Sequence, residues 1–202
     1  MTAPRRVQLE PAYLLHHRPW SDSSRILELM TRNHGRVTLF ARGARRPASA
    51  LRGVLQPFVP LLVSWSGRAD GGTLVGAEIG GVLRPLPPAQ LMSGFYLNEL
   101  LLHLLPREDR HERVFDGYAA AIGQLAGAAD HRSLRVFELI LLEELGYGLE
   151  LSRDSGSGEP LQPDQYYHFQ AGRGLLAVRD AAGDADAFLG SDLLAAASGA
   201  FD

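Results

Sequence analysis

The stretch GRVTLFAR, residues 35–42, alternates apolar and polar side chains with a period of two. This period is typical of a strand that has one face in a core and the other toward solvent. The first face carries Val37, Leu39 and Ala41, and the second carries Arg36, Thr38, Phe40 and Arg42. The stretch therefore predicts a strand that buries its aliphatic side and presents arginines around an exposed aromatic ring.

Four further segments of the first 83 residues have the same short, turn-bounded character. They are residues 7–18, 24–31, 58–66 and 73–83, and the last two flank the hairpin signal Asp70-Gly71-Gly72. Strands at this spacing predict a small all-β barrel or sandwich. Five strands with a short helical turn near residues 47–53 match the OB-fold, a partly open barrel that binds oligonucleotides. We expect this domain to span residues 1–83.

The hydrophobic period changes to about 3.6 after the proline-rich residues 84–88. Helices are predicted over residues 89–105, 109–126 and 131–146. The first should bury Leu91, Phe95, Leu97 or Asn98, Leu101 and Leu105, and the third should end at glycine caps, Gly146 and Gly148. These helices predict an α-helical domain over residues 84–150.

A small C-terminal subdomain is predicted over residues 151–202. It contains a loop, a hairpin around residues 172–174 and a short helix near residues 190–198. The chain is thus expected to be an α+β protein, with an N-terminal five-stranded OB-fold barrel, an α-helical domain and this subdomain.

Positive charge is concentrated in the first part of a chain whose formal net charge is −3. Residues 1–80 hold 11 arginines and five acidic residues, whereas residues 81–202 hold nine arginines and 18 acidic residues. No acidic residue lies between Glu28 and Asp70, a window that contains seven arginines. Mixed charges would serve solubility, so this pattern favours a site for a polyanion, with arginines on its phosphates. The candidates are Arg36, Arg42, Arg45, Arg46, Arg52 and Arg68.

Several classes of protein are disfavoured by the residues that the chain lacks. There is no cysteine for a disulfide or a thiolate metal site, and no lysine for an ATP-binding P-loop. His16 and His17 are adjacent on a predicted strand and point to opposite faces, so they do not chelate one metal together. We expect no catalytic residues, no metal and no cofactor, although an unrecognised hydrolase stays an alternative. No apolar run of about 18 residues predicts a membrane span, so we expect a cytoplasmic, nucleoid-associated protein.

Two further groups of residues suggest binding sites, one for nucleic-acid bases and one for a peptide. Trp20, Phe40, Phe58 and Trp65 are available for base stacking, although each is of a type usually found in a core. In the third predicted helix, Arg135 precedes Leu139 by one turn, an arrangement that can capture an apolar peptide through its terminal carboxylate. The alternative is a surface arginine paired with Glu138 or Asp130.

Longer strings in the chain resemble the RecO family of bacterial recombination mediators. The strings occur in the same order as in that family, from about residue 7 to about residue 180. They are HHRPWSDSSRILELMTRNHGRVTLFARGARR (16–46), LRGVLQPFVPLLVSWSGR (51–68), GFYLNELLLHLLPRED (94–109), RVFELILLEELGYG (135–148) and GSGEP (156–160). The resemblance implies an N-terminal OB-fold, a helical middle domain and a small C-terminal subdomain.

The resemblance also implies a function and partners. RecO-like proteins bind single- and double-stranded DNA and anneal complementary strands without ATP. They engage the acidic, phenylalanine-ended tail of single-stranded-DNA-binding protein, and with RecR they help to load RecA. The basic positions of the family fall on Arg36, Arg42, Arg45, Arg46 and Arg52. The arginine of the third helix falls on Arg135, and we expect Leu139 and Tyr118 to line the groove for the tail.

Two departures from the family pattern affect these expectations. Many relatives bind zinc through four cysteines after the LGYG motif, whereas Asp154 and Ser157 occupy that loop here, so no zinc is expected. Relatives also usually extend for some tens of residues, with further basic charge, past the point where this chain ends, so part of the DNA surface would be missing. The alternative function is that of a generic OB-fold RNA-binding or ribosome-associated protein without annealing activity.

Overall fold

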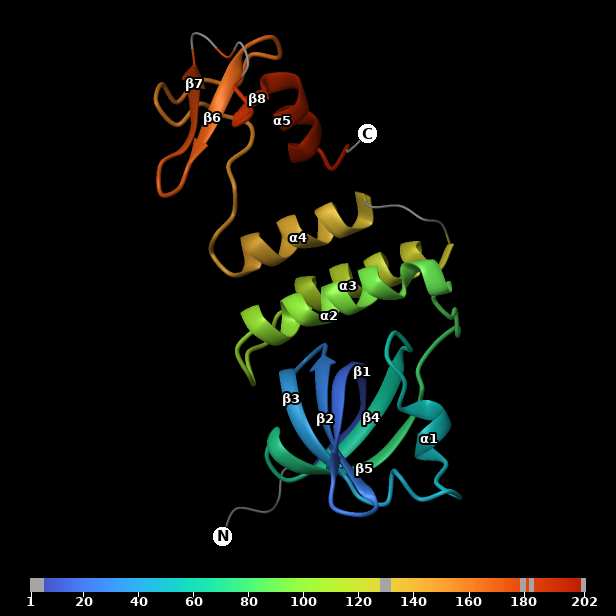
Figure 1. Cartoon of the computed structure of the whole chain (residues 1–202). Helices are drawn as coiled ribbons and strands as arrows, with labels where there is room; N and C mark the ends of the chain where they lie inside the picture. The colour runs from blue at the N-terminus through green and yellow to red at the C-terminus, as the bar shows by residue number, and fades with distance from the viewer. Residues whose placement is uncertain (1–5, 128–131, 179–180, 182–183, 201–202) are drawn as a thin grey trace. The chain divides into compact units, whose positions relative to one another are not determined.

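The computed structural model describes every residue except 1–5, 128–131, 179–180, 182–183 and 201–202. The first five strands form a closed barrel in the order β1-β2-β3-β5-β4, with β3 and β5 parallel and the other neighbours antiparallel (Figure 1). The elements are β1 (Arg6–Trp20), β2 (Ser24–Thr31), β3 (Gly35–Ala41), α1 (Leu51–Val54), β4 (Leu61–Ser66) and β5 (Asp70–Ile79). The predicted five-stranded OB-fold barrel is confirmed.

The alternation in β3 builds the barrel core as predicted. Val37, Leu39 and Ala41 are fully buried in one apolar cluster with residues from every other strand of the barrel. The opposite face of β3 follows the prediction only in part, because Arg36 and Phe40 are partly exposed and the residue between them is not. Thr38 is buried, and its hydroxyl donates a 3.0 Å hydrogen bond to Glu28 of β2. The start of β3 is partly covered because the segment around Arg107 pairs with it at Arg36.

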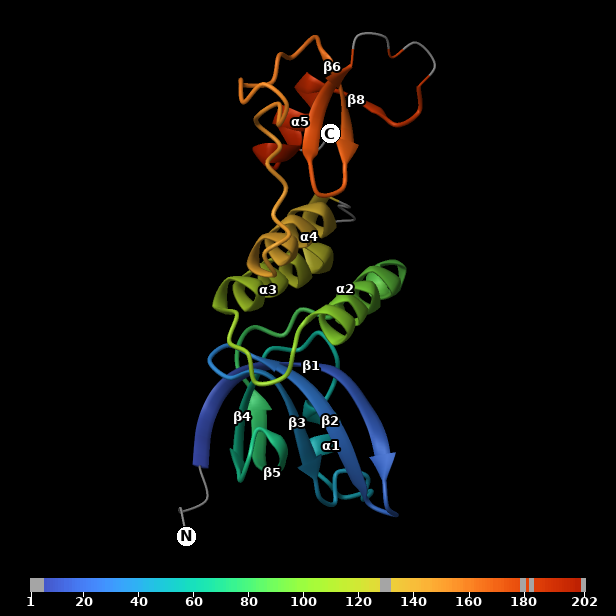
Figure 2. The same ribbon diagram turned by 90° about the vertical axis from the view of Figure 1, so that its left-hand side faces the viewer.

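Three helices follow the barrel, and α2 and α3 lie beside one end of it (Figure 2). The elements are η1 (Pro88–Gln90), α2 (Leu91–Leu104), α3 (Glu112–Gly127) and α4 (Arg132–Glu144). The third predicted helix ends as expected: Gly146 has φ +81°, its N–H donates to the Glu143 carbonyl, and that of Tyr147 donates to Leu142. These two bonds form a Schellman cap, in which glycine accommodates the left-handed backbone.

The buried face of α2 is rotated relative to the prediction. Leu91 and Phe95 are exposed, whereas the helix buries Gly94, Leu97, Asn98 and Leu101. A Cβ on Gly94 would lie 2.8 Å from atoms of both Leu86 and Phe58. The helix therefore turns its one glycine toward these two side chains, because only a residue without a Cβ lets them pack so closely against the helix backbone.

A buried amide joins the barrel to the helices. The register of β1 against β2 shifts between Leu14 and His16, and the Leu15 carbonyl accepts a 2.9 Å hydrogen bond from the Asn98 side chain. The Asn98 oxygen accepts a 2.6 Å bond from the Tyr118 hydroxyl. Burial raises the pKa of Tyr118 well above its usual value, so the hydroxyl stays a donor. One polar network thus connects β1, α2 and α3 inside an apolar core.

The C-terminal segment has its own small core. β6 (Tyr166–Gln170), β7 (Gly174–Val178) and β8 (Ala187–Leu189) form a sheet in the order β7-β6-β8, followed by α5 (Gly190–Ala197). Leu161, Tyr167, Leu175 and Leu193 pack together in its interior. The predicted hairpin and the short final helix are confirmed.

The packing divides the chain into two compact units, Met1–Phe137 and Glu138–Asp202, and the division falls within α4. The first unit holds the barrel with α2 and α3, and the second holds the small sheet with α5. The three-part division at residues 83/84 and 150/151 stays a prediction. No helix among the residues described is both long and apolar enough to cross a membrane.

Replacing Asn98 by Ala leaves the Leu15 carbonyl and the Tyr118 hydroxyl buried without their partner. Because each of these two groups costs about 1–3 kcal/mol, we expect urea titrations to show the free energy of unfolding reduced by about 2–6 kcal/mol. Tyr118→Phe keeps the ring and removes the donor, so it should cost about 1–3 kcal/mol. Glu99→Ala, on the exposed side of α2, is the matched control and should change stability by less than about 0.5 kcal/mol. An Asn98 loss no larger than that of Glu99 would contradict the bridging role.

Candidate nucleic-acid interface

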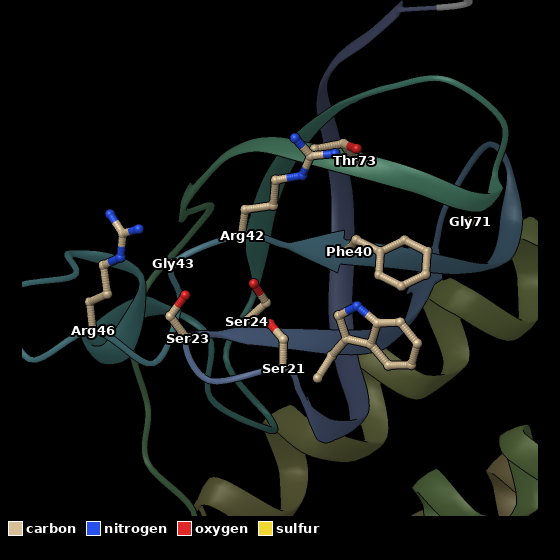
Figure 3. Close-up of a pocket in the computed structure, with 10 residues that line it drawn as sticks. Ser21, Ser23, Ser24, Phe40, Arg42, Gly43, Arg46, Gly71 and Thr73 are labelled. Carbon is tan, nitrogen blue, oxygen red and sulfur yellow. The ribbon is translucent and has the colours of Figure 1, made fainter.

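A pocket of about 620 Å³ opens at the end of β3, between the β1–β2 turn, the loop after β3 and the start of β5. Figure 3 shows Arg42 extending toward Thr73, with Phe40 on the other side and Arg46 on the loop. The residues that line it are Trp20, Ser21, Ser23, Ser24, Phe40, Arg42, Gly43, Arg46, Gly71 and Thr73. The pocket thus combines two aromatic rings, two guanidinium groups and four hydroxyls, and no carboxylate lines it.

The aromatic rings of the pocket come from the ends of two strands. Trp20 is the last residue of β1 and pairs with Ser24, and its side chain is 50% exposed. Phe40, near the end of β3, is partly exposed, and its ring centroid lies 5.7 Å from that of Trp20 in an edge-to-face arrangement. The other two stacking candidates are core residues, since Phe58 is 7% and Trp65 1% exposed. Two of the four aromatic residues therefore reach this surface.

The loop after β3 holds its arginines in place through backbone contacts. Ala44 is fully buried in the barrel core and anchors the loop. The Arg45 N–H donates to the Ser23 carbonyl at 2.8 Å, and its guanidinium donates to the Ser21 carbonyl at 3.0 Å. Gly43 has φ +68°, which lets the chain reverse between Arg42 and Arg46. Arg45 thus ties the loop to the β1–β2 turn, while Arg42 and Arg46 lie on either side of the pocket.

The remaining arginines of the acid-free window separate into two groups. Arg52 on α1 and Arg68 in the β4–β5 turn are exposed but do not line the pocket. Arg32 binds carboxylates of α3, with Asp116 accepting two hydrogen bonds of 2.9 and 3.0 Å and Glu112 lying 3.3 Å away. These bonds lower the pKa of Asp116. Acidic residues of α3, far along the chain, therefore neutralise the positive charge of Arg32, one of the seven arginines between Glu28 and Asp70.

Arg36 is only partly exposed. Its guanidinium donates to the Leu102 carbonyl of α2, and burial lowers the pKa of the side chain. Glu28 opposes that shift, and it also accepts a 3.0 Å bond from Arg107. That Arg36 contacts phosphate stays a prediction, although its guanidinium is bound by the Leu102 carbonyl and the chain that follows α2 covers part of its strand.

The five arginines Arg42, Arg45, Arg46, Arg52 and Arg68 make no ion pair within the residues that the structure describes. The arginines beside the helices differ in this respect, since Arg32, Arg107 and Arg110 each contact a carboxylate. Folding therefore compensates the charges at the barrel–helix junction and leaves those at the pocket uncompensated. Such a field attracts anions and concentrates them at the pocket.

The second predicted site, on α4, is only partly as expected. Arg135 is exposed and Leu139, one turn later, is half-buried. Arg135 and Glu138 both have interaction partners, and Asp130 lies outside the described residues. Tyr118 is fully buried, and its hydroxyl is bonded to Asn98, so it is a core residue and does not line an open groove. The apolar period of α3 could not show whether Tyr118 lies in the core or lines a groove, because either place is on the apolar face of the helix.

Leu139 lines a pocket of about 510 Å³ in the second unit, which the sequence did not indicate. Its apolar walls come from Leu139, Leu149, Leu151 and Ala197, and its polar walls from Glu143, Gly148, Glu150 and Ser152. The pocket could hold an apolar side chain. The carboxylates of Glu143 and Glu150 would repel an acidic ligand unless a local cation offset them.

The loop that contains Asp154 and Ser157 is held by hydrogen bonds to Asp154. Its carboxylate accepts from the Gly156 N–H at 2.9 Å and from the Ser157 hydroxyl at 3.0 Å. The Gly156 bond is the main cause of a lowered Asp154 pKa. Over the described part of the chain, no three histidine, aspartate or glutamate side chains gather as metal ligands would. The expectation of no zinc and no cofactor stays a prediction.

Two family profiles cover almost all of the chain. The profile described as Recombination protein O N terminal matches residues 7–80, which contain the barrel. The profile described as Recombination protein O C terminal matches residues 88–197, which contain the helices and the small sheet. Residues 81–87, between the two matches, lie between β5 and η1.

Curated relatives agree with these profiles. The DNA repair protein RecO of Thiobacillus denitrificans is 49% identical over 187 residues, which cover 87% of this chain and 72% of the relative. That of Coxiella burnetii RSA 493 is 46% identical over 191 residues, covering 95% and 82%. That of Methylococcus capsulatus is 45% identical over 200 residues, covering 98% and 81%. By both profiles and by these identities, the chain belongs to the RecO family of DNA repair proteins.

Proposed function

We propose that this protein is a non-enzymatic mediator that binds single- and double-stranded DNA through its barrel and anneals complementary strands without ATP. The observation that supports this most directly is the loop with Arg42, Arg45 and Arg46, which carries three positive charges without a carboxylate partner among the described residues. Guanidinium groups match phosphate oxygens bidentately, and their contacts need no particular base sequence. Because the chain belongs to a DNA repair family, we infer that the bound polyanion is DNA.

Annealing follows from charge neutralisation. Two complementary strands repel each other through their phosphates, and bound arginines release condensed counterions and reduce that repulsion. The loop that carries Arg42 and Arg46 is anchored by Ala44 and Arg45, so the cations are positioned before the strand arrives. A rigid cationic surface can hold one strand extended while a second strand pairs with it. No group in this process needs to break a covalent bond.

The protein partners are proposed from the family membership and from two residues of α4. We infer that Arg135 receives the terminal carboxylate of the acidic tail of single-stranded-DNA-binding protein, with Leu139 contacting its last side chain. The two residues are four positions apart on one helix and so lie on the same face. Recruitment by this tail, with RecR as co-mediator, would bring the protein to coated strands at the nucleoid, where RecA is loaded.

The double variant Arg42→Ala with Arg46→Ala tests DNA binding while it leaves the loop anchor Arg45 intact. Each phosphate contact on a single strand contributes about −0.7 to the slope of log K against log salt. Losing two contacts should therefore make the slope less steep by about 1.4, and the variant should anneal complementary oligonucleotides more slowly without nucleotide present. Fluorescence anisotropy at four salt concentrations measures the slope.

A variant with the same loss of charge, Arg84→Ala with Arg173→Ala, is the control, because both arginines are exposed and lie outside the pocket. It should keep the wild-type slope and annealing rate. Equal effects of the two variants would show that only overall charge matters and would contradict the assignment. Binding without annealing in the wild type would instead favour a generic OB-fold RNA-binding or ribosome-associated protein.

Arg135→Ala should weaken binding of an acidic peptide that ends in phenylalanine by about 1.5–3 kcal/mol, the range for a hydrogen bond to a charged group. Affinity for naked DNA should remain as in the wild type. Titration of a labelled peptide measures the first quantity, with Arg173→Ala as a control that removes the same charge elsewhere. If the peptide binds Arg135→Ala as well as the wild type, the tail site lies elsewhere.

A further inference from the structure

The two tryptophans of the chain have opposite environments. Trp65 is 1% exposed in the barrel core, where its ring contacts that of His34 at 5.2 Å. Trp20 is 50% exposed at the end of β1. An indole that is half exposed leaves a large apolar surface in water, although the same fold buries its other tryptophan completely. This contrast makes Trp20 a candidate for contact with a ligand.

The arrangement of Trp20 and Phe40 leaves a ring face open. The centroids lie 5.7 Å apart with an interplanar angle of 62°. In such an edge-to-face pair, one ring offers its edge to the other, and its own faces are not covered by that partner. The pair also holds both rings at the pocket, because each packs against the other. A planar ligand can therefore stack there without reorganising the protein.

The rest of the pocket matches the other parts of a nucleotide. Arg42 and Arg46 provide positive charge on the loop, and the hydroxyls of Ser21, Ser23, Ser24 and Thr73 provide hydrogen bonds. The acidic neighbours Asp22 and Asp70 are exposed and do not line the pocket. A volume of about 620 Å³ falls in the range of small-ligand sites. A base with its flanking phosphates satisfies all three features at once.

We propose that the Trp20–Phe40 pocket holds one unpaired nucleobase stacked on the indole, with Arg42 and Arg46 on the adjacent phosphates. This inference rests on the proposed function and adds to it a means of discriminating single strands from duplexes. In a duplex both faces of each base are covered by its neighbours, so no face is available to Trp20. Duplex is then held by phosphate contacts alone.

The discrimination has a consequence for annealing. A base must leave the pocket when it pairs with the complementary strand, because it cannot be stacked on Trp20 and inside a duplex at the same time. Each pairing event thus removes one contact between the protein and its product. Release of the annealed duplex is favoured without an energy source, which agrees with a mediator that lacks a nucleotide-driven step.

Intrinsic fluorescence tests the stacking directly, because of the two tryptophans Trp20 is exposed and Trp65 is buried. Addition of an oligothymidylate should quench the wild-type emission, and a duplex of equal length should not. Trp20→Phe leaves buried Trp65 as the only indole, so its emission should not respond to either ligand. An oligonucleotide of abasic sites keeps the phosphates and should bind without quenching. Equal quenching by the single strand and the duplex would overturn the inference.

Affinity provides the second measurement. Trp20→Ala should weaken single-strand binding by about 5- to 150-fold, the effect expected for one stacked base. Trp20→Phe should retain most of the affinity, and duplex binding should be unchanged in both variants. The matched control is Phe169→Ala, which removes an equally exposed aromatic ring in the second unit. Near-ultraviolet circular dichroism of Trp20→Phe checks that the barrel is intact.

The results also separate this inference from the proposed function. If Trp20→Ala weakens single-strand and duplex binding equally, Trp20 supports the surface without reading unpaired bases, and only the inference fails. Unchanged single-strand affinity in Trp20→Ala has the same meaning. If the wild type and the Arg42/Arg46 double variant bind DNA with the same salt dependence, the barrel loop is not the DNA site and the proposed function fails as well.

Discussion

The hydrogen bond from the Asn98 side chain to the Leu15 carbonyl joins the two parts of the first unit. It exists because β1 changes register against β2 next to Leu15, which frees a carbonyl toward α2. The same strand pairs with β4 through its first half and with β2 through its second half, so it closes the barrel. Its last residue, Trp20, then lies at the pocket. One strand thus determines barrel closure, helix attachment and the position of the exposed indole.

The arginines of the barrel have two different physical roles. Those that face the helices are bound by acceptors on other elements, as Arg32 is by Asp116 and Arg36 by the Leu102 carbonyl. Those at the end of β3 have no acidic partner among the described residues and surround two aromatic rings. The first group stabilises the fold, and the second leaves a local positive field on a protein of net charge −3. Arginines therefore form both the barrel–helix junction and the pocket. Those that the helices cover belong to the junction, and those that the helices leave uncovered belong to the pocket.

The strands, the hairpins and the Gly146 cap could be predicted from the sequence because they depend on local alternation and turn chemistry. The roles of Arg36 and Tyr118 could not, because they depend on partners far along the chain: Leu102 for the first and Asn98 for the second. Gly94 rotates the buried face of α2 through a close approach that no periodicity reveals. The pocket itself joins residues from positions 20–24, 40–46 and 71–73, so only the barrel topology brings them together. The charge pattern indicated the loop, and the fold decided which of its arginines are available.

Photocross-linking of single-stranded DNA tests most directly whether the end of β3 is the DNA site. An oligonucleotide with 5-iododeoxyuridine, which reacts with aromatic side chains that it contacts, would be irradiated with the protein, and the adducts located by mass spectrometry. We predict adducts on Trp20 or Phe40, lost when a duplex replaces the single strand. Adducts confined to the second unit, with none on either ring of the pocket, would contradict it.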